Sequence, residues 1–417
     1  MPAMTSVVPR IIQGGMGAGV SSWHLANAVS RLGQLGVVSG TGLDQIFVRR
    51  LQCGDLGGDI RRAMSHFPFP KMAKRIIDSY FIPGGKQPSA PFCIVGMHTL
   101  RSQRILQELC IASNFVEVFL AREGHSNSVG INYLEKIQLP HLPSLYGAML
   151  AGVSVVIIGA GIPLEIPGVL DNFAIHQPAS YPLHVTGAQA NEDFRMTFDP
   201  ADYIEDRAML PAMKRPVFLP IVASDALAAI LMHRSNGAIN GFVIEGPLAG
   251  GHNAPPRGKL QLSDDGQPVY GPRDVVDLAA MRKLNLPFWL AGSYGTPDQL
   301  QSALVEGAAG IQVGTAFALC VESALTPEIR RALIHKALTG TARVFTDPVA
   351  SPAGFPFKVA ELEGTLSDPV VYQRRHRKCD LGFLREPYRR DDGTLGYRCR
   401  AEPEAHFVAK GGKIEDT

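Results

Sequence analysis

Short runs of consecutive apolar residues are the sequence feature that most constrains how this chain can fold. Ten such runs recur along the 417 residues, and stretches with helical periodicity separate them. Several runs are apolar at successive positions, which is typical of strands covered on both faces and therefore of a parallel sheet. The runs are RIIQ (10–13), LGVVS (35–39), FCIVGM (92–97), FVEVFL (115–120), VGINYL (129–134), VSVVII (153–158), VFLPIV (217–222), GFVIE (241–245), FWLAG (288–292) and GIQVG (310–314).

The connecting segments carry helix start and stop signals. In TPDQLQSALVEG, Thr296 is placed as an N-cap, Pro297 occupies the first helical position and Gly307 ends the helix. Alternating strands and helices allow an open doubly wound sheet or a (β/α)8 barrel. Ten runs for eight barrel positions require that FCIVGM and FVEVFL, or one of them and VGINYL, lie in insertions. We predict an α/β fold, a TIM barrel over residues 1–340 with an insertion around 45–125.

Residues 341–417 differ in composition from the rest and are predicted to be a C-terminal appendage. The stretch VYQRRHRKCDLGFLREPYRRDDGTLGYRCR is polar and rich in arginine, with a predicted hairpin turn at Asp392-Gly393. It suits an anionic partner or, on the interpretation we favour, a solvated cap over the barrel or an oligomer contact. Cys379 and Cys399 lie near His376 and His406 in sequence, so zinc binding stays open beside free thiols.

Charge and hydropathy exclude several classes of partner. The formal net charge of +2 gives no bulk attraction to nucleic acid or to anionic lipid. Residues 142–164 carry no charge, but prolines and glycines divide them into a short helix and a β-branched run, which predicts a buried helix and strand rather than a membrane span. No basic segment followed by an apolar core is visible at the N-terminus, and the cysteines show no CxxC spacing. We therefore expect a cytoplasmic protein.

Two neighbouring strand–helix units predict a phosphate site. FWLAG leads to Gly292 and Ser293, and GIQVG leads to Gly314 and Thr315, each just before a predicted helix. A helix N-terminus attracts anions because its first N–H groups lack partners. Barrel enzymes often bind phosphate after their seventh and eighth strands.

Glycine-rich turns after other strands predict a flat ring at the same end of the sheet. RIIQGGMGAG places Gly14, Gly15, Met16 and Gly17 directly after the first strand, and Gly161 follows VSVVII in the same way. The first turn does not fit a dinucleotide fingerprint, because Ser22 stands where Gly or Ala is expected and no acidic residue ends the next strand. A phosphorylated flat cofactor fits this arrangement, and FMN is the simplest choice. No metal is predicted in the barrel.

Six motifs resemble nitronate monooxygenases, formerly called 2-nitropropane dioxygenases. IIQGGMG, VGINYL, VVIIGAGIP, GFVIEGPLAGGH, FWLAGSYG and GIQVGTAF occur in the order found in that family, over roughly residues 8–325. The resemblance implies an FMN-dependent (β/α)8 enzyme related to the flavin-type enoyl reductases of fatty-acid and polyketide synthesis. It departs from the usual pattern at Glu245-Gly246, where the family usually has Gln-Gly.

The resemblance also assigns site residues. The histidine of the AGGH motif falls on His252, and the flavin-contacting glycines fall on Gly14, Gly15 and Gly17. From the residues themselves, Gly250 and Gly251 remove side chains where the backbone passes a cofactor, so that His252 projects over it. Glu245 ends a buried strand and needs a partner, either an FMN hydroxyl or ring N–H or a salt bridge.

The surrounding residues support weaker assignments. Arg257 is either a substrate contact or, as we favour, a solvated side chain. Residues 258–271, with a turn at Asp265-Gly266, are predicted to form a hairpin lid. Trp23 and His24 are expected to be packing residues.

The expected activity is oxidation of alkyl nitronates or nitroalkanes with O2 to carbonyl compounds and nitrite, with His252 as the catalytic base. The alternative is an enoyl reductase that takes hydride from NAD(P)H and acts on acyl thioesters. A third possibility is a flavin-binding accessory protein without turnover. Expected partners are a small-molecule substrate and either a second copy of the chain or a synthase, but neither nucleic acid nor membrane.

Overall fold

Eight parallel strands form the centre of the molecule and close into a barrel. The computed structural model describes residues 8–379 and 381–417. The strand order is β1-β10-β9-β8-β7-β4-β3-β2, and every neighbouring pair is parallel. The two outermost strands meet, because Gln13 N donates to Leu35 O at 2.9 Å and Leu35 N donates to Ile11 O at 3.1 Å. The strands are β1 (Ile11–Gln13), β2 (Gly36–Ser39), β3 (Val129–Leu134), β4 (Val155–Gly159), β7 (Val217–Val222), β8 (Phe242–Glu245), β9 (Phe288–Ala291) and β10 (Gly310–Val313).

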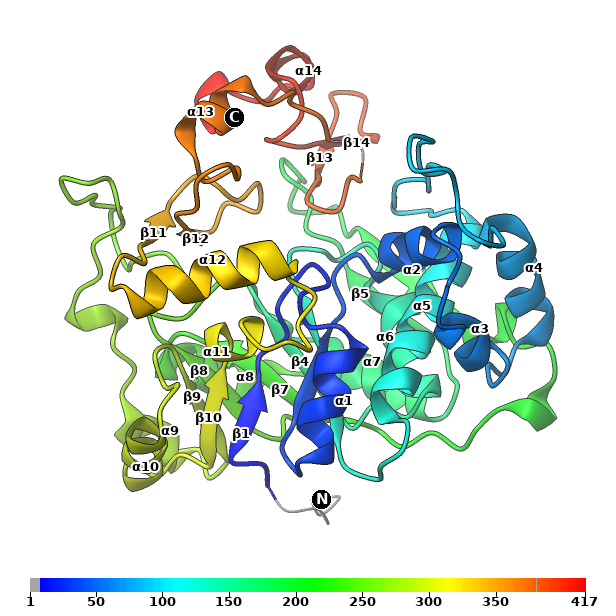
Figure 1. Ribbon diagram of the computed structural model, residues 1–417, viewed down its shortest axis with the longest axis horizontal. Coiled ribbons are helices and arrows are strands. Elements are labelled where there is room, and N and C mark those ends of the chain that lie inside the picture. The colour runs from blue at the N-terminus through cyan, green and yellow to red at the C-terminus, as the bar shows by residue number, and fades with distance from the viewer. Residues whose placement is uncertain (1–7, 380) are drawn as a thin grey trace.

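Helices surround this barrel, as predicted, and the predicted TIM barrel is confirmed (Figure 1). Thr296 caps α10 through a capping box with Gln299, and Gly307 follows the helix with a φ of 86°. The uncharged segment 142–164 supplies α6 and β4 rather than a membrane span. The helices are α1 (Trp23–Arg31), α6 (His141–Leu150), α7 (Ile166–Ala174), α8 (Asp225–Arg234), α9 (Leu278–Lys283), α10 (Pro297–Val305), α11 (Thr315–Ala318) and α12 (Pro327–Leu338).

Two apolar cores hold the barrel together. The larger core lies between the sheet and the helices. The smaller one contains alternate residues of β1, β2, β4, β7, β8 and β9, including Val37, Ile157 and Trp289. Since successive side chains of a strand point to opposite faces, these residues fill the barrel interior. A packed interior leaves the chemistry to the loops at the strand ends.

The two surplus apolar runs are not strands, which corrects the sequence interpretation. FVEVFL lies in α5 (Arg104–Arg122), and FCIVGM lies in an irregular segment before it. A short apolar run cannot by itself distinguish a strand from a buried helix. Helix α5 is buried on nearly all sides, so it lacks the polar face that would have revealed its period. It belongs to a helical segment between β2 and β3 with α2 (Leu43–Gln52), α3 (Asp59–Met64) and α4 (Pro70–Tyr80).

The C-terminal residues form small elements over one end of the barrel. Figure 1 shows them, in orange to red, above the end toward which β1 points. The predicted turn at Asp392-Gly393 joins two antiparallel strands, and Gly393 has a φ of 81°. The elements are β11 (Val344–Asp347), β12 (Phe357–Ala360), α13 (Pro369–Arg374), β13 (Glu386–Arg389), β14 (Leu395–Arg398) and α14 (Glu404–Ala409); a further hairpin, β5 (Ala179–Pro182) and β6 (Arg195–Phe198), lies outside the barrel. The division of the chain at residue 340 stays a prediction.

Candidate functional site

The carboxyl ends of the parallel strands bring the predicted site residues to one rim of the barrel. The glycine turns follow β1, β4, β8, β9 and β10, and four of these strands are consecutive neighbours in the order β1-β10-β9-β8. The turns after Gly292 and Gly314 therefore lie at the same end, as the phosphate interpretation requires. Gly161 follows β4, on another part of the rim. In (β/α)8 barrels this is the end that carries active sites.

Contacts between the turns show how closely they approach. Gly14 N donates to Val313 O at 2.8 Å. A Cβ placed on Gly314 would lie 3.8 Å from Met16 Sδ, and a Cβ placed on Gly292 would lie 2.9 Å from the backbone nitrogen of Ala249. The β1 and β10 turns thus touch each other, and the β8 and β9 turns do the same.

The turns after β9 and β10 have free backbone donors. Gly292 and Ser293 have φ angles of 102° and 63°, a strained conformation for a serine that is commonest at functional sites. In the part of the chain that the structure describes, the backbone N–H groups of Ser293, Tyr294 and Thr315 have no acceptor. Thr315 begins α11. These two turns can bind an anion through the backbone.

The β1 turn is held in place by side-chain hydrogen bonds and by close packing against its glycines. Gln13 Nε2 donates to Ser21 Oγ at 2.8 Å, and Ser21 Oγ accepts from Met16 N at 2.9 Å. A Cβ on Gly15 would lie 2.5 Å from Cβ of Asn132. Asn132 donates to Gly15 O at 3.3 Å, while its own Oδ1 is buried without a partner in the described structure. Sequence reasoning missed Asn132, although a polar residue inside the apolar run VGINYL was a signal.

His252 lies in the loop after β8 and contacts the C-terminal part of the chain. Its Nε2 lies 2.6 Å from Ser351 Oγ, and its ring centroid lies 4.8 Å from that of Phe357. Burial lowers the pKa of His252 below its ordinary value of 6.5. The imidazole is therefore neutral near pH 7. The Ser351 and Phe357 contacts were not predicted, because residues beyond 340 were assigned to an appendage.

The segment 351–358 crosses the rim beside His252. Lys358 N donates to Gly251 O at 3.0 Å, and Asn253 N donates to Pro356 O at 2.8 Å, so the loop and the segment pair like antiparallel strands. On the other side, Lys136 Nζ, which follows β3, lies 5.4 Å from the ring centroid of Phe355. We call residues 351–358 the rim strap.

Glu245, at the end of β8, has a polar partner in the chain itself. Asn253 Nδ2 donates to Glu245 Oε1 at 3.1 Å. Burial raises the pKa of Glu245 to about 8, against the opposing effects of Asn253 and of the positive charge of Lys358. The sequence interpretation left an FMN group or a salt bridge open as its partner. The FMN contact stays a prediction.

The weaker assignments have mixed outcomes. Residues 258–271 do form a hairpin, in which Ser263 N donates to Gln267 O and Val269 N to Gln261 O, both at 2.9 Å. Its role as a lid stays a prediction. The side chain of Arg257 is exposed, and its backbone amide donates to Asp274 Oδ1. Substrate binding by Arg257 stays a prediction.

Four further residues were singled out by sequence. The rings of Trp23 and His24 stack on each other with 3.6 Å between their centroids, and Trp23 packs against the larger core, between the sheet and the helices. Cys379 and Cys399 are free thiols that share a hydrogen bond, which lowers the pKa of Cys379 to about 6.

Among the helices that the structure describes, none combines the length and the apolar composition that a membrane span requires.

Two sequence comparisons find similarity to nitronate monooxygenases. The sequence model of the family described as nitronate monooxygenase matches residues 210–353. A nitronate monooxygenase of Pseudomonas aeruginosa is 28% identical over 198 residues, which cover 48% of this chain and 52% of that protein. The chain thus spans about half the length of the curated relative that it matches.

Solved structures resemble the chain at low identity. FabK from Thermotoga maritima superposes with a TM-score of 0.45 and 17% identity, covering 88% of this chain and 74% of that one. A nitroalkane oxidase from Streptomyces ansochromogenes superposes with a TM-score of 0.42 and 16% identity, covering 84% and 76%.

Proposed function

We propose that this chain, whose residues 210–353 match the sequence model of the nitronate monooxygenase family, is an FMN-dependent oxidoreductase that oxidises alkyl nitronates or nitroalkanes. The observation that carries the proposal is the position of His252. A neutral imidazole lies on the rim where the glycine turns of β1, β8, β9 and β10 come together. The family match includes His252 and extends into the rim strap.

The residues of the rim fit FMN. The free backbone donors of Ser293 and Thr315 suit its phosphate. The unpartnered Oδ1 of Asn132 suits a flat ring with hydrogen-bond donors on its edge. A Cβ on Gly250 would meet no atom within 4 Å, so this glycine leaves space. Bound FMN would supply the electron-accepting ring for the oxidation.

His252 acts as the base for a neutral nitroalkane. In the tautomer that donates from Nε2 to Ser351 Oγ, Nδ1 carries a free lone pair. Nδ1 takes the proton from the carbon beside the nitro group, and the C–H electron pair becomes the C=N bond of the nitronate. Ser351 then fixes the ring orientation, and the neighbouring Phe357 excludes water.

The products follow from atom and charge balance. Two nitronate ions and one O2 give two carbonyl molecules and two nitrite ions. A substrate that is already a nitronate needs no proton removal. His252 therefore matters most for neutral nitroalkanes.

A second candidate is reduction of an enoyl thioester with NAD(P)H. Phe355 and Phe357, beside His252, form an apolar wall that suits an acyl chain. In this reaction His252 would donate a proton to the enolate instead of accepting one. Oxygen uptake and nitrite release with a nitronate, against NAD(P)H consumption with an enoyl thioester, distinguish the two. Bound FMN with neither activity would favour an accessory protein.

The His252→Asn variant tests the role of the imidazole. We expect kcat/KM for a neutral nitroalkane to fall by roughly 10²- to 10⁴-fold, the usual contribution of a positioned base. FMN absorbance and the turnover of a preformed nitronate should change much less. His233→Asn, an exposed histidine at the end of α8, is the matched control. Near-normal nitroalkane turnover by His252→Asn would remove His252 from the mechanism.

A further inference from the structure

A second cluster of reactive side chains lies beside the carboxyl ends of β2 and β3, in the helical segment between these two strands. It consists of Asp44, His98 and Cys110, which are 3%, 5% and 1% exposed. Their ligand atoms all lie within 4.8 Å of one another. Asp44 is in the first turn of α2, Cys110 is in α5, and His98 is in the irregular segment before α5. Three different types of metal ligand thus converge from three parts of the chain.

Two of the three ligand atoms lie close to the third, His98 Nε2. His98 Nε2 lies 2.9 Å from Asp44 Oδ2 and 3.7 Å from Cys110 Sγ. One N–H hydrogen points along one direction and serves one acceptor well, so the hydrogen bond to Asp44 leaves the sulfur of Cys110 outside that bond; the sulfur also contacts the hydroxyl of Ser144. Zn–S and Zn–N bonds of about 2.3 Å and 2.0 Å at tetrahedral angles separate sulfur and nitrogen by about 3.5 Å. The observed Sγ–Nε2 distance is close to this value.

Outer contacts orient two of these ligands. Asp44 Oδ1 accepts from the backbone amide of Gln45 at 2.9 Å, and this leaves Oδ2 facing His98. His98 Nδ1 lies 3.5 Å from Ser102 Oγ on the far side of the ring. Metal-binding residues are typically held by such outer partners. Arg385 also donates to His98 O at 2.6 Å, which connects this segment to the C-terminal elements.

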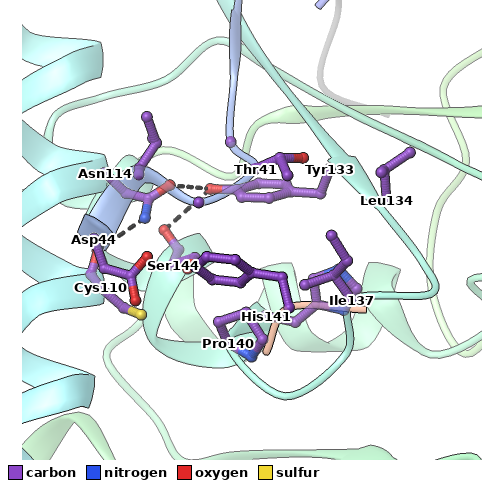
Figure 2. A pocket seen from close by; sticks show the side chains of 14 residues that line it. Thr41, Asp44, Cys110, Asn114, Tyr133, Leu134, Ile137, Pro140, His141 and Ser144 are labelled. Carbon is purple, nitrogen blue, oxygen red and sulfur yellow. Dashed lines mark hydrogen bonds between the residues drawn. The ribbon is translucent and has the colours of Figure 1, made fainter. Parts of the chain in front are cut away.

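The cluster adjoins a cavity with further polar groups. Figure 2 shows Asp44 and Cys110 together at one end of this cavity, near Ser144. His141, which is 1% exposed, also lines the cavity; its ring nitrogens have no side-chain partner in the described structure and are engaged by the backbone of Leu134. A buried imidazole with so few partners suits a cavity that takes a polar ligand or water. The open coordination position of a three-ligand site can face this space.

We propose that Asp44, His98 and Cys110 bind one Zn²⁺ ion. A thiolate, a carboxylate and a neutral imidazole carry two negative charges, which Zn²⁺ neutralises in a site that is closed to solvent. Zn²⁺ takes thiolate, imidazole and carboxylate ligands together, whereas Mg²⁺ and Ca²⁺ prefer oxygen ligands only. The ion would connect α2, α5 and the irregular segment 81–103.

The test uses the whole chain, stripped with a chelator and dialysed against Zn²⁺ and against Co²⁺. We expect one ion per chain, a higher Tm with the metal, and the near-ultraviolet absorption of a Co²⁺–thiolate bond. Cys110→Ser should weaken binding by at least about 100-fold and abolish this absorption. Asp44→Asn should also weaken binding. Cys93→Ser, an exposed thiol in the same irregular segment, is the matched control and should bind normally.

Two outcomes overturn the proposal. One is a wild-type chain that takes up no stoichiometric Zn²⁺, a result that does not depend on whether the variants fold. The other is metal binding that survives Cys110→Ser but disappears in the Cys379→Ser/Cys399→Ser double variant, which would move the site to the C-terminal thiols. Far-UV circular dichroism of each variant shows whether a loss of binding reflects unfolding.

Discussion

Glycines at the rim are needed for two different reasons, which only neighbouring atoms distinguish. Gly15 has no room for a side chain, because its Cβ would lie 2.5 Å from Cβ of Asn132. An atom attached directly to the backbone cannot rotate away. Gly250 has empty space where its Cβ would be, and its φ is not in the left-handed region. The first glycine is required by the packing of the protein, whereas the second lies beside open space, which we propose FMN uses.

Alanine substitutions should separate these two reasons. Gly15→Ala forces the β1 turn to move, so we expect it to destabilise the protein by about 1–3 kcal/mol and also to weaken FMN binding. Gly250→Ala should leave the stability of the apoprotein within about 0.5 kcal/mol and still weaken FMN binding. Thermal unfolding without FMN and fluorescence titration with FMN measure the two effects. Unchanged FMN affinity in Gly250→Ala would show that the cofactor does not use this space.

At the scale of elements, the rim strap determines the environment of the imidazole. Ser351 binds the ring nitrogen of His252, Phe357 packs against the ring, and the backbone of Lys358 pairs with Gly251. A strap of this kind both orients the imidazole and covers it. The lowered pKa of His252 follows from this cover.

Removing the Phe357 ring of the rim strap should change how kcat/KM depends on pH. Phe357→Ala admits water to His252, so its pKa should rise toward the ordinary value of 6.5. Because the base works when it is deprotonated, the acid limb of kcat/KM for a nitroalkane should move to higher pH. An NMR titration of His252 checks the pKa directly. Tyr372→Ala, which removes an exposed aromatic side chain on α13, should change neither the pKa of His252 nor the acid limb of kcat/KM. An unchanged His252 titration in Phe357→Ala would mean that the rim strap does not control the pKa of His252.

At the scale of the whole molecule, a buried carboxyl group makes stability depend on pH. Glu135, directly after β3, is 6% exposed; its Oε1 accepts from Tyr181 at 2.6 Å, and its Oε2 has no partner in the described structure. Burial raises the pKa of Glu135 from 4.5 to about 7. Between these values the native state holds a proton that the unfolded state has lost. The free energy of unfolding therefore falls as pH rises from about 4.5 through 7.

Glu135→Gln should remove this pH-dependent loss of stability. Relative to the wild type, the variant should gain on the order of 1–3 kcal/mol between pH 5 and pH 8, because one pKa unit corresponds to about 1.4 kcal/mol. The Tm difference between the two proteins should accordingly increase by a few degrees toward alkaline pH. Glu363→Gln, an exposed glutamate, should show no such trend. A Tm difference that does not vary with pH would mean that Glu135 is not protonated in the native protein.

The sequence predicted the barrel because each of its eight strands is a local signal. Runs such as VGINYL and VFLPIV have the same bounds as β3 and β7. The interpretation of FVEVFL as a candidate strand was wrong for a reason that is also local. A helix buried on nearly all sides has no polar face to reveal its period. The glycine turns were predictable in the same way, because a parallel sheet takes every strand end to one rim.

The amino-acid pattern is enough to predict the strands, their common direction and hence the shared rim of Gly14, Gly292, Gly314 and His252. The neighbours of individual residues came from the folded molecule: Ser351 and Phe357 against His252, Asn132 against Gly15, and Asp44 with His98 and Cys110. Strand signals lie within a few residues of one another, and the sheet then imposes the same rim on all strands. Contacts between residues up to 117 positions apart depend on how loops and helices pack, and no local pattern in one sequence encodes that packing.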